Sequence, residues 1–278
     1  MSNWKQLLGI DLLALGMAAD SAKREGPWGN VVTYQRTHSV IAAELAGAER
    51  AHAIPDAASE VRLYATPATL DEAIAQVRAL AAAAGSRRTA AFSMAEIEAR
   101  AWASLNEVLR RLIDAGLQDV AELPADGVRD LSASIRALQH AGISPQRVTV
   151  SHPVGPHRVE LLTTVHQALA EHPAVPRFSP LPRVAPVDKP TTGYEDVRAV
   201  ALARLALPQT SIEVDWTLYG PKLAQVALAF GADHLDAVPA IDDASLGRRR
   251  TTVEDVQRNI RAAGFEPKEF RPAAELKN

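Results

Sequence analysis

The sequence contains no cysteine among its 278 residues. This absence excludes disulfides, thiolate metal sites and thiol nucleophiles from the chemistry of the chain. Aromatic residues are scarce at 5%, and neither sign of charge predominates, because 30 Lys and Arg residues stand against 33 Asp and Glu residues. Without a basic excess we expect no nucleic-acid partner. We interpret the short basic run Arg248-Arg249-Arg250 as a solvated loop.

Long apolar runs are also missing. Lys5 and Asp11 interrupt the N-terminal segment, which therefore has the character of neither a signal peptide nor a membrane span. We expect no membrane partner and a cytoplasmic location. The chain lacks a phosphate-binding loop, a dinucleotide fingerprint, a nucleophile elbow and a zinc-binding helix motif. None of these common mechanisms is therefore indicated.

What the sequence does contain is a regular alternation of short apolar runs and amphipathic segments, which is typical of parallel α/β folds. The predicted strands are 31–34, 61–65, 88–93, 117–123, 147–151, 177–181, 211–217 and 234–241. The predicted helices are 7–23, 69–84, 104–115, 128–141, 158–171, 194–206, 220–230 and 252–263. Thr69 with Glu72, and Ser104 with Glu107, have capping-box spacing at two helix starts. We predict a (β/α)8 barrel, complete or slightly degenerate, over residues 31–278, preceded by an N-terminal cap helix within residues 1–30.

Acidic and apolar side chains alternate in SIEVDWT at 211–217. Glu213 and Asp215 therefore share one face of a strand, roughly 6.6 Å apart. If the apolar face packs on the helices, these carboxylates point into the barrel, where a buried charge requires a partner. Two interpretations stay open: structural ion pairs, with Arg183 or Arg36 as the cation, or a substrate-binding or acid–base role.

Polar side chains also follow two other predicted strands. His152 and His157 lie between the strand at 147–151 and the next helix, where a barrel carries its functional loops and where an anion can bind. Asp233, His234 and Asp236 gather in GADHLDAV. Both groups are compatible with a metal site or with solvated polar loops. Because the His pair lacks a carboxylate ligand of evident spacing, we predict no metal.

Four longer stretches carry a family resemblance. They are AAFSMAEIEARAWASLNEVLRRLIDAGLQDV at 90–120, FSPLPRV at 178–184, GYEDVRAVALARLALPQTSIEVDW at 193–216 and YGPKLAQVALAFGADHLDAV at 219–238. In compatible order, they resemble segments of the radical SAM enzymes of the menaquinone (futalosine) pathway, typified by aminofutalosine synthase and dehypoxanthine futalosine cyclase, with the related deazaflavin synthase subunit. The resemblance implies a radical SAM barrel.

The chain also departs from that family. Its members hold a 4Fe–4S cluster on a C-x3-C-x2-C loop after the first strand, whereas the matching region here, VVTYQRTHSVIAAELAGAERAHAI, has no cysteine. Iron–sulfur clusters need thiolate ligands. The Gly-Gly-x-x-Pro turn of the SAM pocket is replaced by ATPATL, and Ala237-Val238 stands where the family usually has Gly-Thr. We expect no cofactor and no reductive cleavage of SAM, as in a cysteine-free, degenerate paralogue.

The preferred functional interpretation is a non-catalytic partner subunit or small-molecule-binding protein linked to menaquinone biosynthesis. It would associate with a cluster-bearing homologue or with itself. The resemblance implies that a pocket for an aromatic carboxylate or a nucleoside survives at the barrel mouth. The predicted ligand-binding residues are Tyr34, Arg36, Tyr64, Glu96, Arg183, Asp233 and His234. The alternative is a lyase or hydrolase in which Glu213, Asp215, His152 and His157 perform polar acid–base catalysis.

Overall fold

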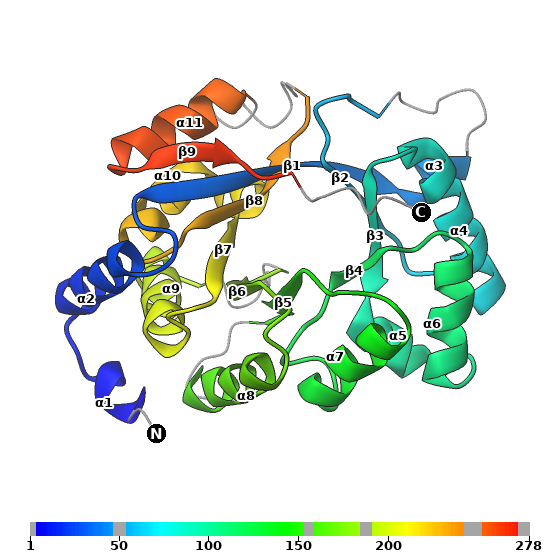
Figure 1. Ribbon diagram of the computed structural model, residues 1–278, viewed down its shortest axis with the longest axis horizontal. Helices are drawn as coiled ribbons and strands as arrows, with labels where there is room; N and C mark the ends of the chain where they lie inside the picture. The colour runs from blue at the N-terminus through cyan, green and yellow to red at the C-terminus, as the bar shows by residue number, and fades with distance from the viewer. Residues whose placement is uncertain (1–3, 47–53, 153–157, 184–190, 242–251, 272–278) are drawn as a thin grey trace.

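The computed structural model describes residues 4–46, 54–152, 158–183, 191–241 and 252–271. Its strands are β1 Val31–Ile41, β2 Glu60–Tyr64, β3 Arg88–Ser93, β4 Asp119–Glu122, β5 Arg147–Val150, β6 Arg177–Pro182, β7 Ser211–Asp215, β8 His234–Pro239 and β9 Glu266–Glu269. The first eight are parallel neighbours in the order β4-β3-β2-β1-β8-β7-β6-β5. They surround a common centre and confirm the predicted (β/α)8 barrel (Figure 1).

The two ends of this sheet, β4 and β5, meet through a short parallel bridge between Pro124 and Thr149. The Thr149 amide donates to the Leu123 carbonyl, and the Ala125 amide donates to the Thr149 carbonyl, both at 2.9 Å. Pro124 has no amide hydrogen and cannot donate to a ladder. The barrel is therefore nearly closed, with its weakest junction between β4 and β5.

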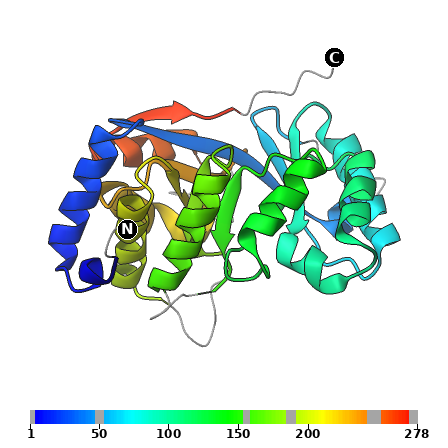
Figure 2. The same cartoon turned by 60° about the horizontal axis from the view of Figure 1, so that its bottom comes forward.

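Helices cover the outside of the sheet. They are α1 Trp4–Leu8, α2 Leu12–Glu25, α3 Ala42–Ala46, α4 Leu70–Ala84, α5 Met94–Arg100, α6 Leu105–Asp114, α7 Leu131–His140, α8 Arg158–Glu171, α9 Gly193–Ala206, α10 Trp216–Ala229 and α11 Val253–Ala262. In the turned view the green helices of the middle of the chain lie in front of the strands (Figure 2). Thr69 and Ser104 accept the amides of Glu72 and Glu107, as the predicted helix starts require. Among the described residues, no helix combines the length and the apolar character of a membrane span.

Helix α10 begins four residues earlier than its predicted start at residue 220. The Asp215 carboxylate accepts the Leu218 amide at 2.7 Å and caps the helix at the end of β7. Gly220, with a φ of 73°, joins two helical pieces ahead of Pro221. The Gly-Pro pair therefore marks a kink inside the helix rather than its beginning, because glycine adopts positive φ at little cost.

The predicted N-terminal helix is divided into α1 and α2, because Asp11 caps the second piece by accepting the Leu13 amide at 2.9 Å. Helix α2 packs beside α9 and contacts α10. Lys23 anchors it: its Nζ atom donates to the Leu228 carbonyl at 3.1 Å and lies 3.2 Å from the centroid of the Phe265 ring. Burial lowers the pKa of Lys23 to about 7.

Strand β9 was not predicted, because its sequence EPKE has none of the apolar alternation of a strand. It forms by pairing with the first half of β1, in the register Val31 with Glu266 and Tyr34 with Glu269. Phe270, directly after β9, lies edge-on to the His234 ring and faces the guanidinium of Arg177 at 4.2 Å. Since His234 and Arg177 are the first residues of β8 and β6, Phe270 closes the amino-terminal end of the barrel.

Candidate binding site at the carboxyl ends of the strands

The barrel interior is charged rather than apolar. Along β2, β5, β7 and β8, buried polar residues alternate with apolar ones, so that one face of each strand meets the helices and the other meets the lumen. TIM barrels usually fill the lumen with branched apolar side chains. Here the lumen holds Glu60, Arg62, Arg147, Arg177, Glu213, His234 and Asp236, all nearly inaccessible to solvent.

Arg147 of β5 lies at the centre of this group. Its guanidinium is within 3.4 Å of a carboxylate oxygen of Glu60 and of Glu213, and 3.5 Å from Asp236. Arg62 of β2 donates to Glu60 at 2.5 Å and to Asp236 at 2.9 Å. In the sheet, β5 is a neighbour of neither β2 nor β8, and β2 is not a neighbour of β8. These ion pairs therefore cross the lumen and connect strands that share no ladder.

Arg183, one residue after β6, covers the upper side of this network. It donates to Glu213 at 2.6 Å, to Asp215 at 2.8 Å and to Asp236 at 3.1 Å. The predicted ion pairing of Glu213 and Asp215 with Arg183 is therefore confirmed. Arg36, the other cation considered, donates instead to the carbonyls of Pro239 and Ala240, at 3.3 and 2.7 Å.

The carboxyl groups of the network have pKa values that are shifted in different directions. Burial opposes ionisation of Asp236, but Arg147, Arg62 and Arg183 outweigh it and hold the pKa of Asp236 well below its usual range. Against the same burial, Arg147 and Arg62 lower the pKa of Glu60 to about 2. At Glu213 burial and the neighbouring Asp236 prevail and raise its pKa. Glu213 is therefore the carboxyl group of the three that most readily keeps a proton.

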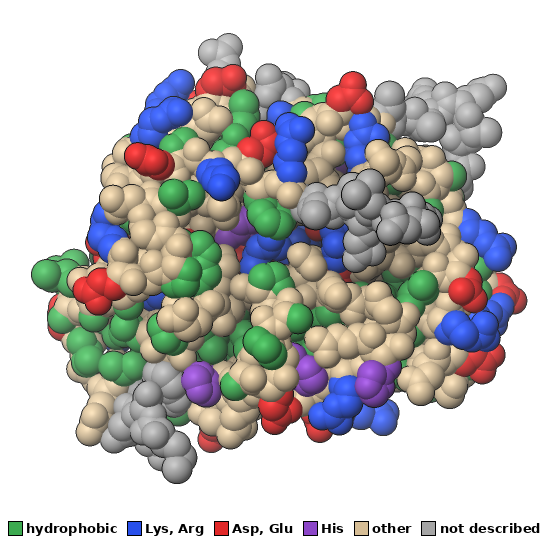
Figure 3. All heavy atoms as spheres, in the orientation of Figure 1, with side chains coloured by type: hydrophobic (Ala, Val, Ile, Leu, Met, Phe, Trp, Pro, Cys, Tyr) green, Lys and Arg blue, Asp and Glu red, His purple; other side chains and the backbone are tan. Residues whose placement is uncertain are grey.

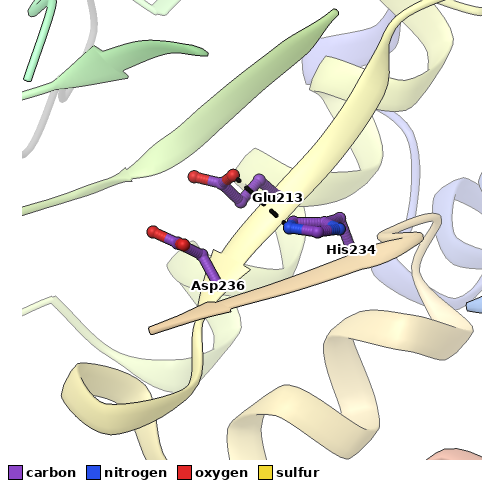
Figure 4. Close-up of side chains that lie close together, drawn as sticks. All are labelled: Glu213, His234 and Asp236. Carbon is purple, nitrogen blue, oxygen red and sulfur yellow. Dashed lines mark ion pairs between the residues drawn. The ribbon is translucent and has the colours of Figure 1, made fainter. Parts of the chain in front are cut away.

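His234 lies beside Glu213 near the amino-terminal end of the lumen. Its Nδ1 atom is 2.6 Å from the Thr33 hydroxyl, and its Nε2 atom is 3.9 Å from Glu213 Oε2 (Figure 4). Burial, followed by the positive charge of Arg177, lowers the pKa of His234 well below its usual value, so the ring is neutral. Neither His234 Nε2 nor Glu213 Oε2 has a hydrogen-bond partner among the described residues.

Glu213, His234 and Asp236 bring three possible metal-ligand atoms within 4.8 Å of one another (Figure 4). The donor chemistry does not favour a cation there. Both oxygens of Asp236 already accept from guanidinium groups, and Glu213 Oε1 accepts from Arg183. A divalent ion would have to displace these arginines from the carboxylates, and the nearby guanidinium groups would repel it. We interpret the group as the lower part of the ion-paired network.

A cavity of about 930 Å³ opens above the network, at the carboxyl ends of the strands where barrel enzymes carry their sites. Arg183 and Asp215 contribute to its lining, next to the charged network. Other lining residues end or follow strands on several sides of the barrel: Ser39, Tyr64, Phe92, Ser93, Glu96, Glu122, Ser151, His152, Thr217 and Ala237. The volume suits a small organic ligand.

Two residues of the lining have a strained backbone. Phe92 of β3 has a φ of 61° and Ala237 of β8 has a φ of 54°. Non-glycine residues rarely adopt positive φ, and such strain tends to gather at ligand sites. At residue 237 the resembling family usually has glycine. A glycine there would relieve the backbone strain of the positive φ.

The structure brings together five of the predicted site residues and disperses the others. Tyr64, Glu96, His152, Arg183 and Asp215 line the cavity. Glu213 lies beneath it, bound to Arg183, and His234 lies deeper in the lumen. His157 is outside the described residues.

Three predicted ligand-binding residues lie away from the cavity lining. The Tyr34 hydroxyl accepts from Gln257 of α11 at 2.9 Å. Arg36 donates to main-chain carbonyls after β8. Asp233 precedes β8, pairs with Arg204 of α9 and accepts the Ile212 amide at 3.2 Å. These contacts indicate structural roles for all three residues.

Sequence reasoning missed Glu60, Arg62, Arg147 and Asp236 as members of one network. A signal was present, because EVRLY and HLDAVP show the same charged and apolar alternation as SIEVD. Applied to every strand rather than to β7 alone, this period of two would have predicted a charged lumen.

Comparison with known proteins supports a family relationship. Residues 176–276 match the family described as the CofH/MqnC C-terminal region. A relative from Archaeoglobus fulgidus, named 5-amino-6-(D-ribitylamino)uracil–L-tyrosine 4-hydroxyphenyl transferase, is 26% identical over 203 residues, which cover 60% of this chain and 57% of the relative. The chain therefore matches little more than half of that protein's length.

Solved structures of low sequence identity share the fold. Methylornithine synthase (PylB) is 13% identical with a TM-score of 0.66, over 96% of this chain and 93% of its own. HydG, a maturase of the FeFe-hydrogenase, is 13% identical with a TM-score of 0.64, over 94% of this chain and 71% of its own.

Proposed function

Because this chain is related to the CofH/MqnC-type radical SAM enzymes, we propose that it is a cluster-less relative of them that binds a small molecule at the barrel mouth without radical chemistry. We place this role in menaquinone biosynthesis, as the resemblance implies. The observation that carries the proposal is the cavity of about 930 Å³ above a fixed, ion-paired network. A rigid base with a few polar groups and apolar walls has the composition of a ligand site.

The donor atoms of the chain do not fit an iron–sulfur cluster. Such clusters are held by thiolates, and this chain has none. His38 of β1, a histidine in the region that matches the cluster loop of the family, already interacts with other residues of the chain. We therefore derive no step through a cluster.

Binding is better supported than polar acid–base catalysis. A general base must come within hydrogen-bond reach of the substrate. Glu213 is fully buried and engaged by Arg183 and Arg147. Asp215 reaches the cavity, but its two oxygens accept from Arg183 and from the Leu218 amide. The carboxylates first considered for catalysis are thus committed to the scaffold.

The test is thermal unfolding of the chain with futalosine-type nucleosides, chorismate-derived aromatic acids and SAM, one compound at a time. A ligand at about 100 times its Kd stabilises the folded state by about 2.7 kcal/mol. We expect at least one compound to raise Tm. Ser39→Trp, at an exposed position in the cavity lining, should abolish the shift, and Ser86→Trp, an exposed serine after α4, should not. An equal shift of Tm in both variants would show that the compound binds outside the cavity. No shift with any compound would refute the proposal.

A second candidate role, as a partner subunit, is favoured by one surface feature. Leu13 and Met17 of α2, one helical turn apart, are 72% and 75% exposed, and Leu8 and Tyr194 nearby are also exposed. Hydrophobic side chains gather over α1 and α2 at the left of Figure 3. Contiguous exposed apolar side chains often mark protein contacts.

The partner in this role is a cluster-bearing homologue or a second copy of the chain. Light scattering of the chain alone, and co-purification with such a homologue, test the two. Leu13→Glu with Met17→Glu should abolish the association, whereas Val226→Glu, at an exposed apolar residue of α10, should not. A strictly monomeric chain that never co-purifies with a homologue would exclude this role.

A further inference from the structure

We infer that the mouth cavity selects a ligand in which a protonated amine adjoins a flat ring, and that it discriminates against carboxylates. This inference rests on the proposed function and names the ligand class of the same site. It follows from the charge balance of the described lining, from carboxylate oxygens there that lack a hydrogen-bond partner, and from the aromatic side chains beside them.

Arg183 is the one guanidinium among the described residues of the cavity lining, and its charge is already shared with carboxylates. Its side chain is 7% exposed and is shared among Glu213, Asp215, Asp236 and, at 3.5 Å, Glu122. Glu213 and Asp236 are shared with Arg147, but within the described residues Glu122 and Asp215 pair with Arg183 alone. These two carboxylates already offset the charge that an anionic ligand would need. A ligand carboxylate would have to displace partners at 2.6 to 3.1 Å from the terminal nitrogens of Arg183, or accept from Arg183 Nε directly beside the Glu122 carboxylate, which lies 3.5 Å from that nitrogen.

Two carboxylates in the lining are available to a cation. Glu96 of α5 has no hydrogen bond or ion pair within the described part of the chain. Glu122, at the end of β4, is 15% exposed, and its Oε2 atom lacks a hydrogen-bond partner there. Arg183 Nε, 3.5 Å from that oxygen, is also without a hydrogen bond. A ligand amine that donates to Glu122, beside a hydroxyl that accepts from Arg183, would satisfy both buried groups.

Aromatic side chains lie in the same lining. The Tyr64 side chain ends β2 at the cavity and Phe92 belongs to β3, the neighbouring strand. Rings attract cations over their faces and stack on flat ligands. Leu63 and Leu218 add apolar surface. An amine held by Glu96 and Glu122 would therefore have its ring against Tyr64 or Phe92.

This charge pattern separates the two ligand classes that the family resemblance implies. An aromatic carboxylate would bring a negative charge next to Glu96, Glu122 and Asp215. A nucleoside that carries an aliphatic amine, which is protonated at neutral pH, brings a flat ring, a cation and hydroxyls for Ser39, Ser93 and Thr217. The described lining therefore favours nucleosides with an aliphatic amine over aromatic acids.

Three indoles of similar size test the inference: tryptamine, tryptophol and indole-3-propionate, which carry a positive, a neutral and a negative group on the same ring. Their Kd values are measured by ligand-observed NMR or calorimetry on the full chain. We expect tryptamine to bind at least tenfold more tightly than indole-3-propionate, with tryptophol between them. We also expect the tryptamine affinity to fall with added salt, since the attraction is electrostatic.

Glu96→Gln removes the unpaired carboxylate and keeps the shape of the side chain. It should weaken tryptamine binding about fivefold or more, leave tryptophol unchanged and strengthen indole-3-propionate binding. Glu107→Gln, on the exposed side of α6 outside the cavity, is the matched control and should change none of the three.

The outcomes distinguish the inference from the proposed function. Indole-3-propionate binding more tightly than tryptamine, with loss of both in Ser39→Trp, would overturn the charge argument and leave the pocket standing. Equal weakening of tryptamine by Glu96→Gln and Glu107→Gln would place the amine outside the cavity and overturn the assignment of Glu96. If none of the indoles binds and no compound of the thermal panel shifts Tm, the inference and the proposed function both fail.

Discussion

Arg147→Met probes whether the charged lumen holds the barrel together. Arg147 is fully buried and is the shared partner of Glu60, Glu213 and Asp236, which come from β2, β7 and β8. Methionine is of similar length, but it leaves these three carboxylates with guanidinium ion pairs to Arg62 and Arg183 alone among the described residues. Removing one partner from a buried ion pair typically costs about 3–5 kcal/mol, because the remaining charge stays desolvated.

The expected loss can be read as a change in melting temperature. An unfolding entropy of about 2.1 cal/mol/K per residue gives about 0.6 kcal/mol/K for a chain of 278 residues. A loss of about 3–5 kcal/mol then lowers Tm by about 5–9 °C. Urea unfolding followed by circular dichroism measures the free energy, and calorimetry measures Tm. Arg110→Met, which breaks an exposed pair with Asp114 on α6, should cost no more than about 0.5 kcal/mol.

A second substitution separates charge from packing. Glu213 is the carboxyl group whose pKa the network raises, so Glu213→Gln removes a charge that is poorly tolerated once Arg147 is gone. The double variant Arg147→Met with Glu213→Gln should therefore be more stable than the sum of the single changes by about 1 kcal/mol or more. A single Arg147→Met variant within about 1 kcal/mol of the wild type, or strictly additive effects, would refute the view that the lumen depends on this balance of charges.

Three further predictions concern pH and backbone strain. The folded-state pKa values of Asp236 and Glu60 are depressed, that of Glu60 to about 2. Their contribution to stability is therefore present above their ordinary pKa values of 3.8 and 4.5, and it should be lost as pH falls from about 4.5 toward 2. Stability that is flat across this range in acid titrations would contradict this expectation. The pKa of Lys23 is lowered to about 7, so the folded state binds this proton less tightly than the unfolded state. The free energy of unfolding should therefore rise between about pH 7 and 10, and the rise should be smaller in Lys23→Met. An unchanged pH profile in that variant would exclude Lys23 as the source of the rise. Ala237→Gly should raise the free energy of unfolding by up to about 1 kcal/mol, because relief of a positive φ outweighs the extra chain entropy of glycine; a loss of more than about 1 kcal/mol would show that the φ of 54° is not strained.

The candidate site was only partly accessible from the sequence. The interpretation of Glu213 and Asp215 as partners of Arg183 needed only the strand period of two and a cation expected at the barrel mouth. Tyr34, Arg36 and Asp233 were also predicted to bind a ligand, Asp233 because the family resemblance implies a place near the barrel mouth. Their side chains find partners away from the cavity lining. Tyr34 and Arg36 alternate along β1 with Gln35, whose side chain meets Glu60 of the lumen, and successive residues of a strand face opposite sides of the sheet.

The sequence by itself determined the eight strands of the barrel and the longer helices between them, through apolar periodicity and capping residues that act within a few positions of one another. The short helices α3 and α5 were not predicted. It also excluded thiolate chemistry, because composition does not depend on folding. Only the tertiary structure decided which charges meet. Arg147 and Glu60 are 87 residues apart, and Arg62 and Asp236 are 174 apart. Their contacts depend on strand register and on closure of the barrel, and these arise from all the strands together.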